Sequence, residues 1–128
     1  MHTIISIILL ASSITLSAGE ISKKPDFLRK DKSGKITHKG VHTTDDSGYV
    51  IRYDIYDSSD VLVATIIPYY AKSGKLLECR QYDAKGRLGV VAVFVGKKLV
   101  YLDPTGKFID SYDEKSPVMN QYIKQFQK

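Results

Sequence analysis

Apolar and polar residues alternate with a period of two along much of the chain, interrupted at short intervals by turns. The clearest example is residues 49–56, where Tyr and Ile hold the odd positions and Val, Arg, Asp and Tyr the even ones. Such alternation is typical of an antiparallel strand with one buried face. Similar runs predict strands at 35–43, 61–70, 75–82, 88–95, 99–102 and 108–112.

The predicted strands are separated by a recurring turn pattern, Asp-x-x-Gly. It occurs at 31–34, 45–48, 83–86 and 103–106, with Ala in the first place at 71–74 and Asp60 in the glycine place at 57–60. An Asp side chain caps its own turn, and a left-handed fourth residue closes a hairpin that has a bulge. We expect Asp60 to adopt the left-handed conformation, which Asp tolerates less readily than Gly.

The spacing of apolar residues changes near the end of the chain. Ser116 and Pro117 are typical of a helix N-cap and first turn. Apolar residues then recur at helical spacing, at Val118, Met119, Tyr122, Ile123 and Phe126. We therefore predict a mainly β (α+β) fold, an antiparallel β-meander of about six or seven strands with one C-terminal helix packed on the sheet.

The first residues favour export. Residues 4–16 are uncharged and largely apolar, a run too short for a membrane span of ~20 residues. Ser17-Ala18-Gly19 then offers the small residues of a cleavage site. We predict a signal peptide at 1–19, an irregular N-terminal arm at 20–34 and a single β-rich domain with the C-terminal helix at 35–128. The mature protein is then secreted or periplasmic and has no stable membrane span.

The middle of the chain resembles a known repeat family. Tyr69-Tyr70-Ala-Lys-Ser-Gly74-Lys-Leu76 and Tyr82-Asp-Ala-Lys-Gly86-Arg-Leu88-Gly89 are similar to the degenerate MORN-like β-hairpin repeats of bacterial proteins. The resemblance covers residues 69–107, although the second glycine of the repeat is present only at Gly89. It implies an array of hairpins with a binding or toxin–antitoxin type of role, and it transfers no catalytic residues.

The distribution of charge and the single cysteine exclude few classes of function. The net charge is +5, but basic and acidic residues are interspersed, which indicates a mixed soluble surface. Together with export, this argues against a nucleic-acid partner. Cys79 cannot form an intramolecular disulfide, so it is either buried as a small hydrophobic residue or paired between chains.

No catalytic or metal-binding motif stands out. His38 and His42 share a face of a predicted strand, but residues four apart on a strand lie ~13 Å apart, too far to share one ion. No serine lies in a Gly-x-Ser-x-Gly elbow, and most Asp residues are explained by turns. We therefore expect no catalytic residues, no bound metal and no cofactor.

The composition instead favours binding. The chain has nine Tyr and no Trp, and Tyr and Arg often dominate binding energy. Even spacing puts Arg52 with Tyr56, and Arg80 with Tyr82, on one face of their strands. We predict that these four residues form a ligand surface. The alternative is that the arginines are ordinary solvated residues and that Tyr82 turns inward beside Leu76.

These features predict an exported, non-catalytic binding protein, best described as a protein-binding inhibitor or immunity protein of the bacterial periplasm. Its partner would be another protein, either a toxin or a hydrolase. A structural or surface-associated envelope module is the alternative, and a small hydrolase is a third. The oligomeric state stays open.

Export predicts a new N-terminus. N-terminal sequencing of protein recovered from the envelope or the medium should begin near Glu20, because the small residues before it form the cleavage site. Recovery of cytosolic protein that still begins with Met1 would contradict this prediction.

Overall fold

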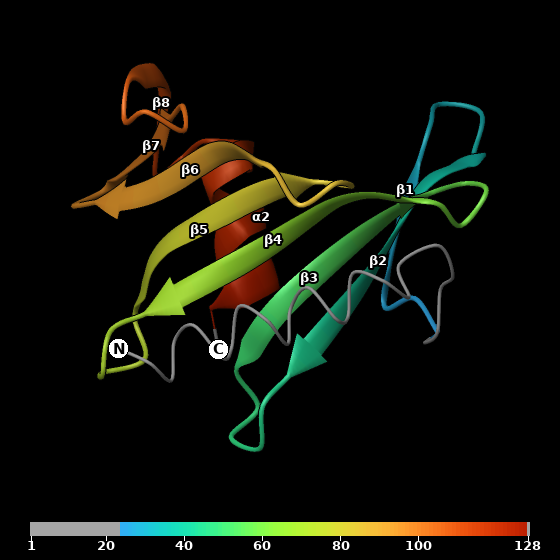
Figure 1. Cartoon of the computed structure of the whole chain (residues 1–128), viewed down its shortest axis with the longest axis horizontal. Coiled ribbons are helices and arrows are strands. Elements are labelled where there is room, and N and C mark those ends of the chain that lie inside the picture. Colours follow the sequence, from blue (N-terminus) through green and yellow to red (C-terminus); the bar gives the residue numbers. More distant parts are fainter. Residues whose placement is uncertain (1–23, 128) are drawn as a thin grey trace.

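The structure, a computed structural model, describes residues 24–127, so the predicted signal peptide lies outside the described residues. The strands are β1 (Phe27–Lys30), β2 (Ile36–Thr44), β3 (Val50–Asp57), β4 (Leu62–Tyr70), β5 (Leu76–Asp83), β6 (Leu88–Val95), β7 (Lys98–Leu102) and β8 (Phe108–Asp113). Each pairs antiparallel with the next, in the spatial order β1 to β8. The helix α2 (Pro117–Phe126) follows. The prediction of a mainly β meander with one C-terminal helix is confirmed (Figure 1).

The strand that the sequence did not predict is β1, which lies inside the segment 20–34 that we expected to be irregular. Its exposed Arg29 and Lys30 hide any alternating pattern. Charged residues are common on edge strands, where they discourage pairing with other chains. Pairing with β2 holds this strand in place, because the Asp26 amide donates to Gly40 O at 3.0 Å and Phe27 pairs with Gly40.

The hairpin turns within residues 24–127 share one geometry, except the two-residue turn between β6 and β7, where Val95 pairs with Lys98. In the first, Asp31 Oδ1 accepts from the amides of Ser33 at 2.8 Å and Lys35 at 3.1 Å, while the Gly34 amide donates to Asp31 O. The same carboxylate bonds recur at Asp45, Asp57, Asp83 and Asp103. The ladders beside these turns show the register shifts of a bulge.

The turns at 57–60 and 71–74 each replace one residue of the Asp-x-x-Gly pattern. They show whether the Asp or the left-handed residue is required for the hairpin. Asp60 has a φ of 65°, as expected from its position in the glycine place. The turn that begins at Ala71 lacks the capping carboxylate, yet the Gly74 amide still donates to Ala71 O at 2.9 Å and Gly74 has a φ of 91°. The left-handed fourth residue therefore defines the hairpin, and the Asp cap adds to its stability.

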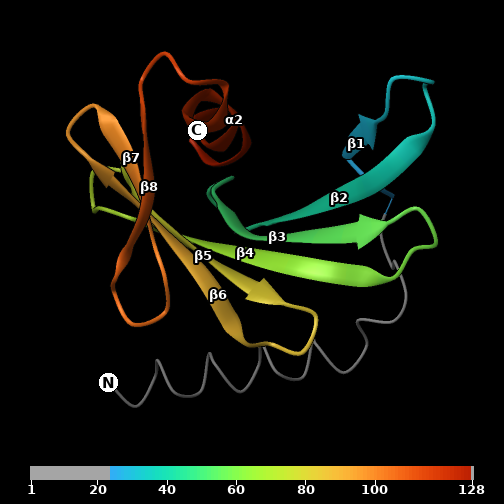
Figure 2. The same cartoon turned by 90° about the horizontal axis from the view of Figure 1, so that it is seen from above.

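The sheet curves around the helix. Figure 2 shows α2 on one side of the sheet, with the strands at both edges bending toward that side. Ser116 is the N-cap, as the sequence predicts, with its Oγ accepting from the Val118 amide at 3.2 Å. Within residues 24–127 no helix is long and apolar enough to span a membrane.

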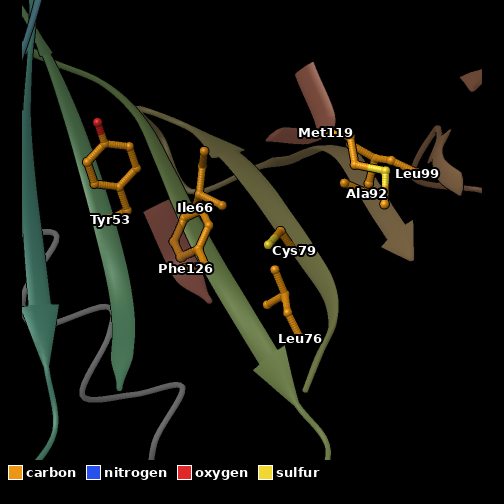
Figure 3. Packing of buried hydrophobic residues seen from close by; sticks show 8 residues of the cluster. All are labelled: Tyr53, Ile66, Leu76, Cys79, Ala92, Leu99, Met119 and Phe126. Carbon is orange, nitrogen blue, oxygen red and sulfur yellow. The ribbon is translucent and has the colours of Figure 1, made fainter. Parts of the chain in front are cut away.

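The main core lies between α2 and the concave face of the sheet. It contains Tyr53, Ile66, Leu76, Cys79, Ala92, Leu99, Met119 and Phe126 (Figure 3). Ile123, which we included in the apolar stripe of the helix, is 38% exposed, so that stripe is narrower than expected. Cys79 is only 1% exposed, and burial raises the pKa of its thiol to about 12. A thiol so placed packs as a small hydrophobic residue and is inaccessible to a second chain.

The end of α2 is anchored where the β3–β4 ladder opens. That ladder ends at the Tyr53–Ile66 pair, two residues before Pro68, which has no amide hydrogen to donate. There the Tyr70 hydroxyl lies 2.8 Å from Val50 O and 2.9 Å from Phe126 O. One tyrosine thus ties β4 both to β3 and to the last turn of the helix.

The turn at 71–75 offers a test of the Asp cap. Ala71→Asp should add an acceptor for the amides of Ser73 and Lys75, the bonds that Asp45 makes in its own turn. We expect the free energy of unfolding to rise by at least about 0.5 kcal/mol at neutral pH, measured by thermal or urea unfolding.

Acid should remove this gain. In the existing turns, hydrogen bonds from Ser33 and Lys35 lower the pKa of Asp31 from 3.8, and those from Thr105 and Lys107 do the same for Asp103. A carboxyl with a lowered pKa stabilises the fold above its unfolded value and loses that effect as the pH falls through the folded value. Ala84→Asp, which adds a carboxylate outside the capping place, is the control; an equal gain there would contradict the prediction.

Candidate binding groove

Two of the predicted ligand residues, Arg52 and Tyr56, are buried. They lie on the sheet face opposite α2 and are 8% and 7% exposed. Arg52 Nε donates to both carboxylate oxygens of Asp54, at 2.9 and 3.0 Å, and Thr65 Oγ1 donates to Asp54 Oδ1 at 2.7 Å. Tyr56 packs in a small cluster with Val41 and Leu62. This burial differs from the expectation that both side chains are presented to a ligand, because each has partners within the sheet.

The other two residues, Arg80 and Tyr82, share that face and are more accessible. Arg80 Nε donates to Glu78 Oε2 at 2.7 Å, and its guanidinium lies 4.9 Å from the centre of the Tyr69 ring. Tyr82 lies near both groups, since it helps to raise the pKa of Tyr69, after burial, and the pKa of Arg80, after Glu78. Tyr82 therefore lies on the Arg80 side of its strand and does not turn inward beside Leu76. A binding role for Arg80 and Tyr82 stays a prediction.

On the other face, the structure shows a groove of about 380 Å³ between the sheet and one flank of α2. Aromatic side chains form much of its wall, namely Phe27, Tyr53, Tyr101, Tyr122 and Phe126. Aliphatic side chains complete it, among them Ile55, Ala64 and Val118. The helix covers only part of the concave face, and the groove is the part beside it.

The aromatic walls form a connected row. Tyr53 meets Phe27 edge-on at a centroid distance of 6.5 Å and Phe126 at 5.8 Å. Tyr122 continues the row, 6.1 Å from Phe126 and 6.1 Å from Tyr101. Edge-to-face and stacked ring contacts of this kind add about 0.5–1.5 kcal/mol each beyond the area they bury. The row therefore gives the groove a rigid wall made by residues from three strands, β1, β3 and β7, and the helix.

Tyr53 holds its place because Gly40 leaves room for it. A Cβ added at Gly40 would lie 2.5 Å from Tyr53 Cε1 and 2.6 Å from Cζ, far inside van der Waals contact. An aromatic ring lying over a glycine of the neighbouring strand is a known way of shielding exposed backbone. The other side of the ring is covered by His42, whose ring stacks on it at 4.1 Å.

His42 is oriented by Asp26, the residue before β1. Its Nδ1 lies 2.5 Å from Asp26 Oδ1, and its amide donates to Asp26 Oδ2 at 3.0 Å. Its Nε2 is buried and has no hydrogen-bond partner in the described part of the chain. The other histidine considered as a metal ligand, His38, lines the groove instead. Within residues 24–127 no three His, Cys, Asp or Glu side chains are grouped to hold a metal ion.

Polar groups in the groove are few and placed at defined points. Arg29 and His38 face one another across the β1–β2 ladder, and Gln81, Gln121 and Gln125 add amides. Burial raises the pKa of Tyr53 to about 12, Asp26 adds to this shift, and the charge of Arg29 opposes it. Burial also raises the pKa of Tyr101 and Tyr122. These phenols therefore stay neutral hydrogen-bonding groups at physiological pH.

Sequence reasoning missed the groove for a physical reason. Its residues come from β1, β2, β3, β4, β5, β7 and α2, so no local motif contains them. The available signal was the alternation in residues 49–56, because Tyr53 and Ile55 belong to the apolar face that this pattern assigns to the core. The alternation does not predict where α2 packs on that face, and the helix leaves part of the face open.

Comparison with known proteins adds little. No protein-family model matches the chain, and no curated protein matches it. A chain in the crystal structure of the GtfA/B complex bound to UDP and GlcNAc is similar over 81% of this chain and 28% of its own length. The TM-score is 0.30 and the sequence identity 10%, and a likeness of this size carries no argument about function.

The packing of Tyr53 on Gly40 can be tested by adding one methyl group. Gly40→Ala should lower the free energy of unfolding by about 1–3 kcal/mol, because the ring must move out of a filled site. Gly89→Ala is the matched control, since its nearest neighbour would be Gln81 O at 3.7 Å, an ordinary contact. Urea unfolding measures both variants, and equal stability of the two would contradict this view of the Tyr53 site.

Proposed function

We propose that the protein is an exported, non-catalytic binding protein that receives a segment of another protein in the groove beside α2. In the bacterial periplasm this would make it an inhibitor or immunity protein that binds a toxin or a hydrolase. The observation that carries the proposal is the groove itself. Its volume of about 380 Å³ falls within the range of ~300–1,000 Å³ found for ligand pockets.

The lining supports binding of side chains. Pockets that bind ligands are lined mostly by apolar and aromatic groups, with a few polar groups that fix orientation. Here five aromatic rings form the wall, and Arg29, His38 and three glutamines supply the polar groups. Binding energy in protein interfaces is concentrated where a few side chains fill such pockets.

The preformed shape of the groove favours affinity. Tyr53 is 5% exposed and is held between Gly40 and His42, so the wall loses little freedom when a ligand binds. A wall that is already ordered lowers the entropic cost of association. The rings of Tyr101 and Tyr122 likewise support one another, edge-on at a centroid distance of 6.1 Å.

Blocking the groove tests the proposal. Ala64 lines the groove, so Ala64→Phe should fill it, whereas Ala84→Phe adds the same ring to an exposed turn. A protein captured from the envelope by the wild type should bind Ala64→Phe more weakly by upward of ~2 kcal/mol and Ala84→Phe equally well. Titration calorimetry measures both affinities, and unfolding midpoints confirm that both variants fold.

Two results would contradict the proposal. One is a captured protein that binds Ala64→Phe as tightly as the wild type. The other is sedimentation of the protein with membranes or peptidoglycan in the absence of a protein partner, which would favour an envelope module.

A further inference from the structure

The charged side chain that lines the groove is basic. Among the lining residues that belong to the described range 24–127, Arg29 is the permanent cation, and none is Asp or Glu. The Arg29 side chain is exposed, and within residues 24–127 it takes part in none of the ion pairs. Its guanidinium is therefore free to receive an anion from a ligand.

The carboxylates that lie near Arg29 in the sequence, or opposite a groove residue in the sheet, are already engaged. Asp31, two residues after Arg29, accepts from the amides of Ser33 and Lys35 in its own turn. Asp26 binds the ring and amide of His42. Asp57, which pairs across the ladder with His38, accepts from the amides of Ser59 and Val61 in its own turn. Asp83 pairs across the ladder with Ala64 and binds Arg87. Each of these carboxylates has its own donors, so the positive charge at the groove is left for a ligand.

The positive charge and the aromatic wall lie close together. Arg29 and Phe27 project from the same side of β1, two residues apart, and Phe27 meets the Tyr53 ring. The charge of Arg29 acts on Tyr53 directly, since it lowers the pKa of that hydroxyl against the larger upward effect of burial. A fitting ligand must therefore carry an anionic group beside a planar apolar group.

In a polypeptide, the C-terminal residue is the simplest way to place an anionic group beside a planar side chain. Adjacent side chains of an extended segment point to opposite sides, so an Asp next to an aromatic residue directs its carboxylate away from the ring. At the last residue of a chain, the backbone carboxylate belongs to the same residue as the side chain. The two groups then reach one pocket together.

We infer that the groove binds the C-terminal residue of a partner polypeptide, with an aromatic side chain against the Tyr53–Phe126–Tyr122 wall and the terminal carboxylate on Arg29. The inference rests on the proposed function and names the part of the partner that is recognised. An Arg–carboxylate pair is strengthened by charge-assisted hydrogen bonds, which give orientation as well as affinity.

The chain has no Trp, so indole fluorescence from a peptide reports the peptide alone. The probes are acetyl-Ala-Gly-Ala-Trp with a free carboxylate, the same peptide with a C-terminal amide, and acetyl-Ala-Gly-Trp-Asp amide, which places the carboxylate on a side chain. Fluorescence titration of the full chain should show the free acid binding at least about tenfold more tightly than either amide, the loss of one charged contact.

Matched variants locate the charge. Arg29→Gln should remove the preference for the acid over the amide, while Lys30→Gln, the same loss of charge on the next residue of β1, should keep it. Ala64→Phe should weaken all peptides together. Equal binding of acid and amide by the wild type, or equal effects of Arg29→Gln and Lys30→Gln, would overturn the inference.

Failure of the inference can be told from failure of the proposed function. Suppose that Ala64→Phe weakens binding of a captured protein but the peptide acid and amide bind with equal affinity. The groove then binds a partner without recognising its C-terminal carboxylate. If the partner ignores Ala64→Phe, the proposed function itself fails.

Discussion

The contact on which the groove depends is the packing of the Tyr53 ring over Gly40. The Tyr53 ring joins β3 to three other elements. It stacks on His42 of β2 and meets Phe27 of β1 and Phe126 of α2 edge-on. A side chain at position 40 would displace it. Since β1 carries Arg29, the position of this cation at the groove follows from this contact as well.

The hairpins supply the register that this contact requires. A shift of one residue in a strand would exchange the two faces of that strand, and in β3 it would send Tyr53 to the side now held by Arg52 and Asp54. The left-handed residue that closes each turn prevents such a shift, and it does so even at Ala71, where the capping carboxylate is missing. The two sheet faces then differ in kind. One carries the helix and the groove, and the other carries ion pairs such as Arg52–Asp54 and Arg80–Glu78.

Features encoded locally could be predicted from the sequence. Alternation and the Asp-x-x-Gly turns predict the strands from β2 to β8, and Ser116-Pro117 predicts the start of the helix. Features that depend on distant residues could not. The strand β1 carries an exposed, charged sequence and is fastened by Gly40 and His42, which lie on another strand. The burial of Arg52 depends on its pairing with Asp54 and on Thr65 of β4. The groove depends on where α2 crosses the sheet, which no periodicity contains.

Ligands are expected to bind beside α2 and not on the opposite sheet face. A map of backbone amide shifts in a nitrogen-15-labelled sample, recorded while the peptide ending in Trp is added, tests this expectation most directly. We predict that the shifts cluster on β1, on the concave residues near Tyr53 and on α2 around Tyr122. Shifts that cluster instead around Tyr69, Arg80 and Tyr82 would contradict it and place the binding surface on the other face.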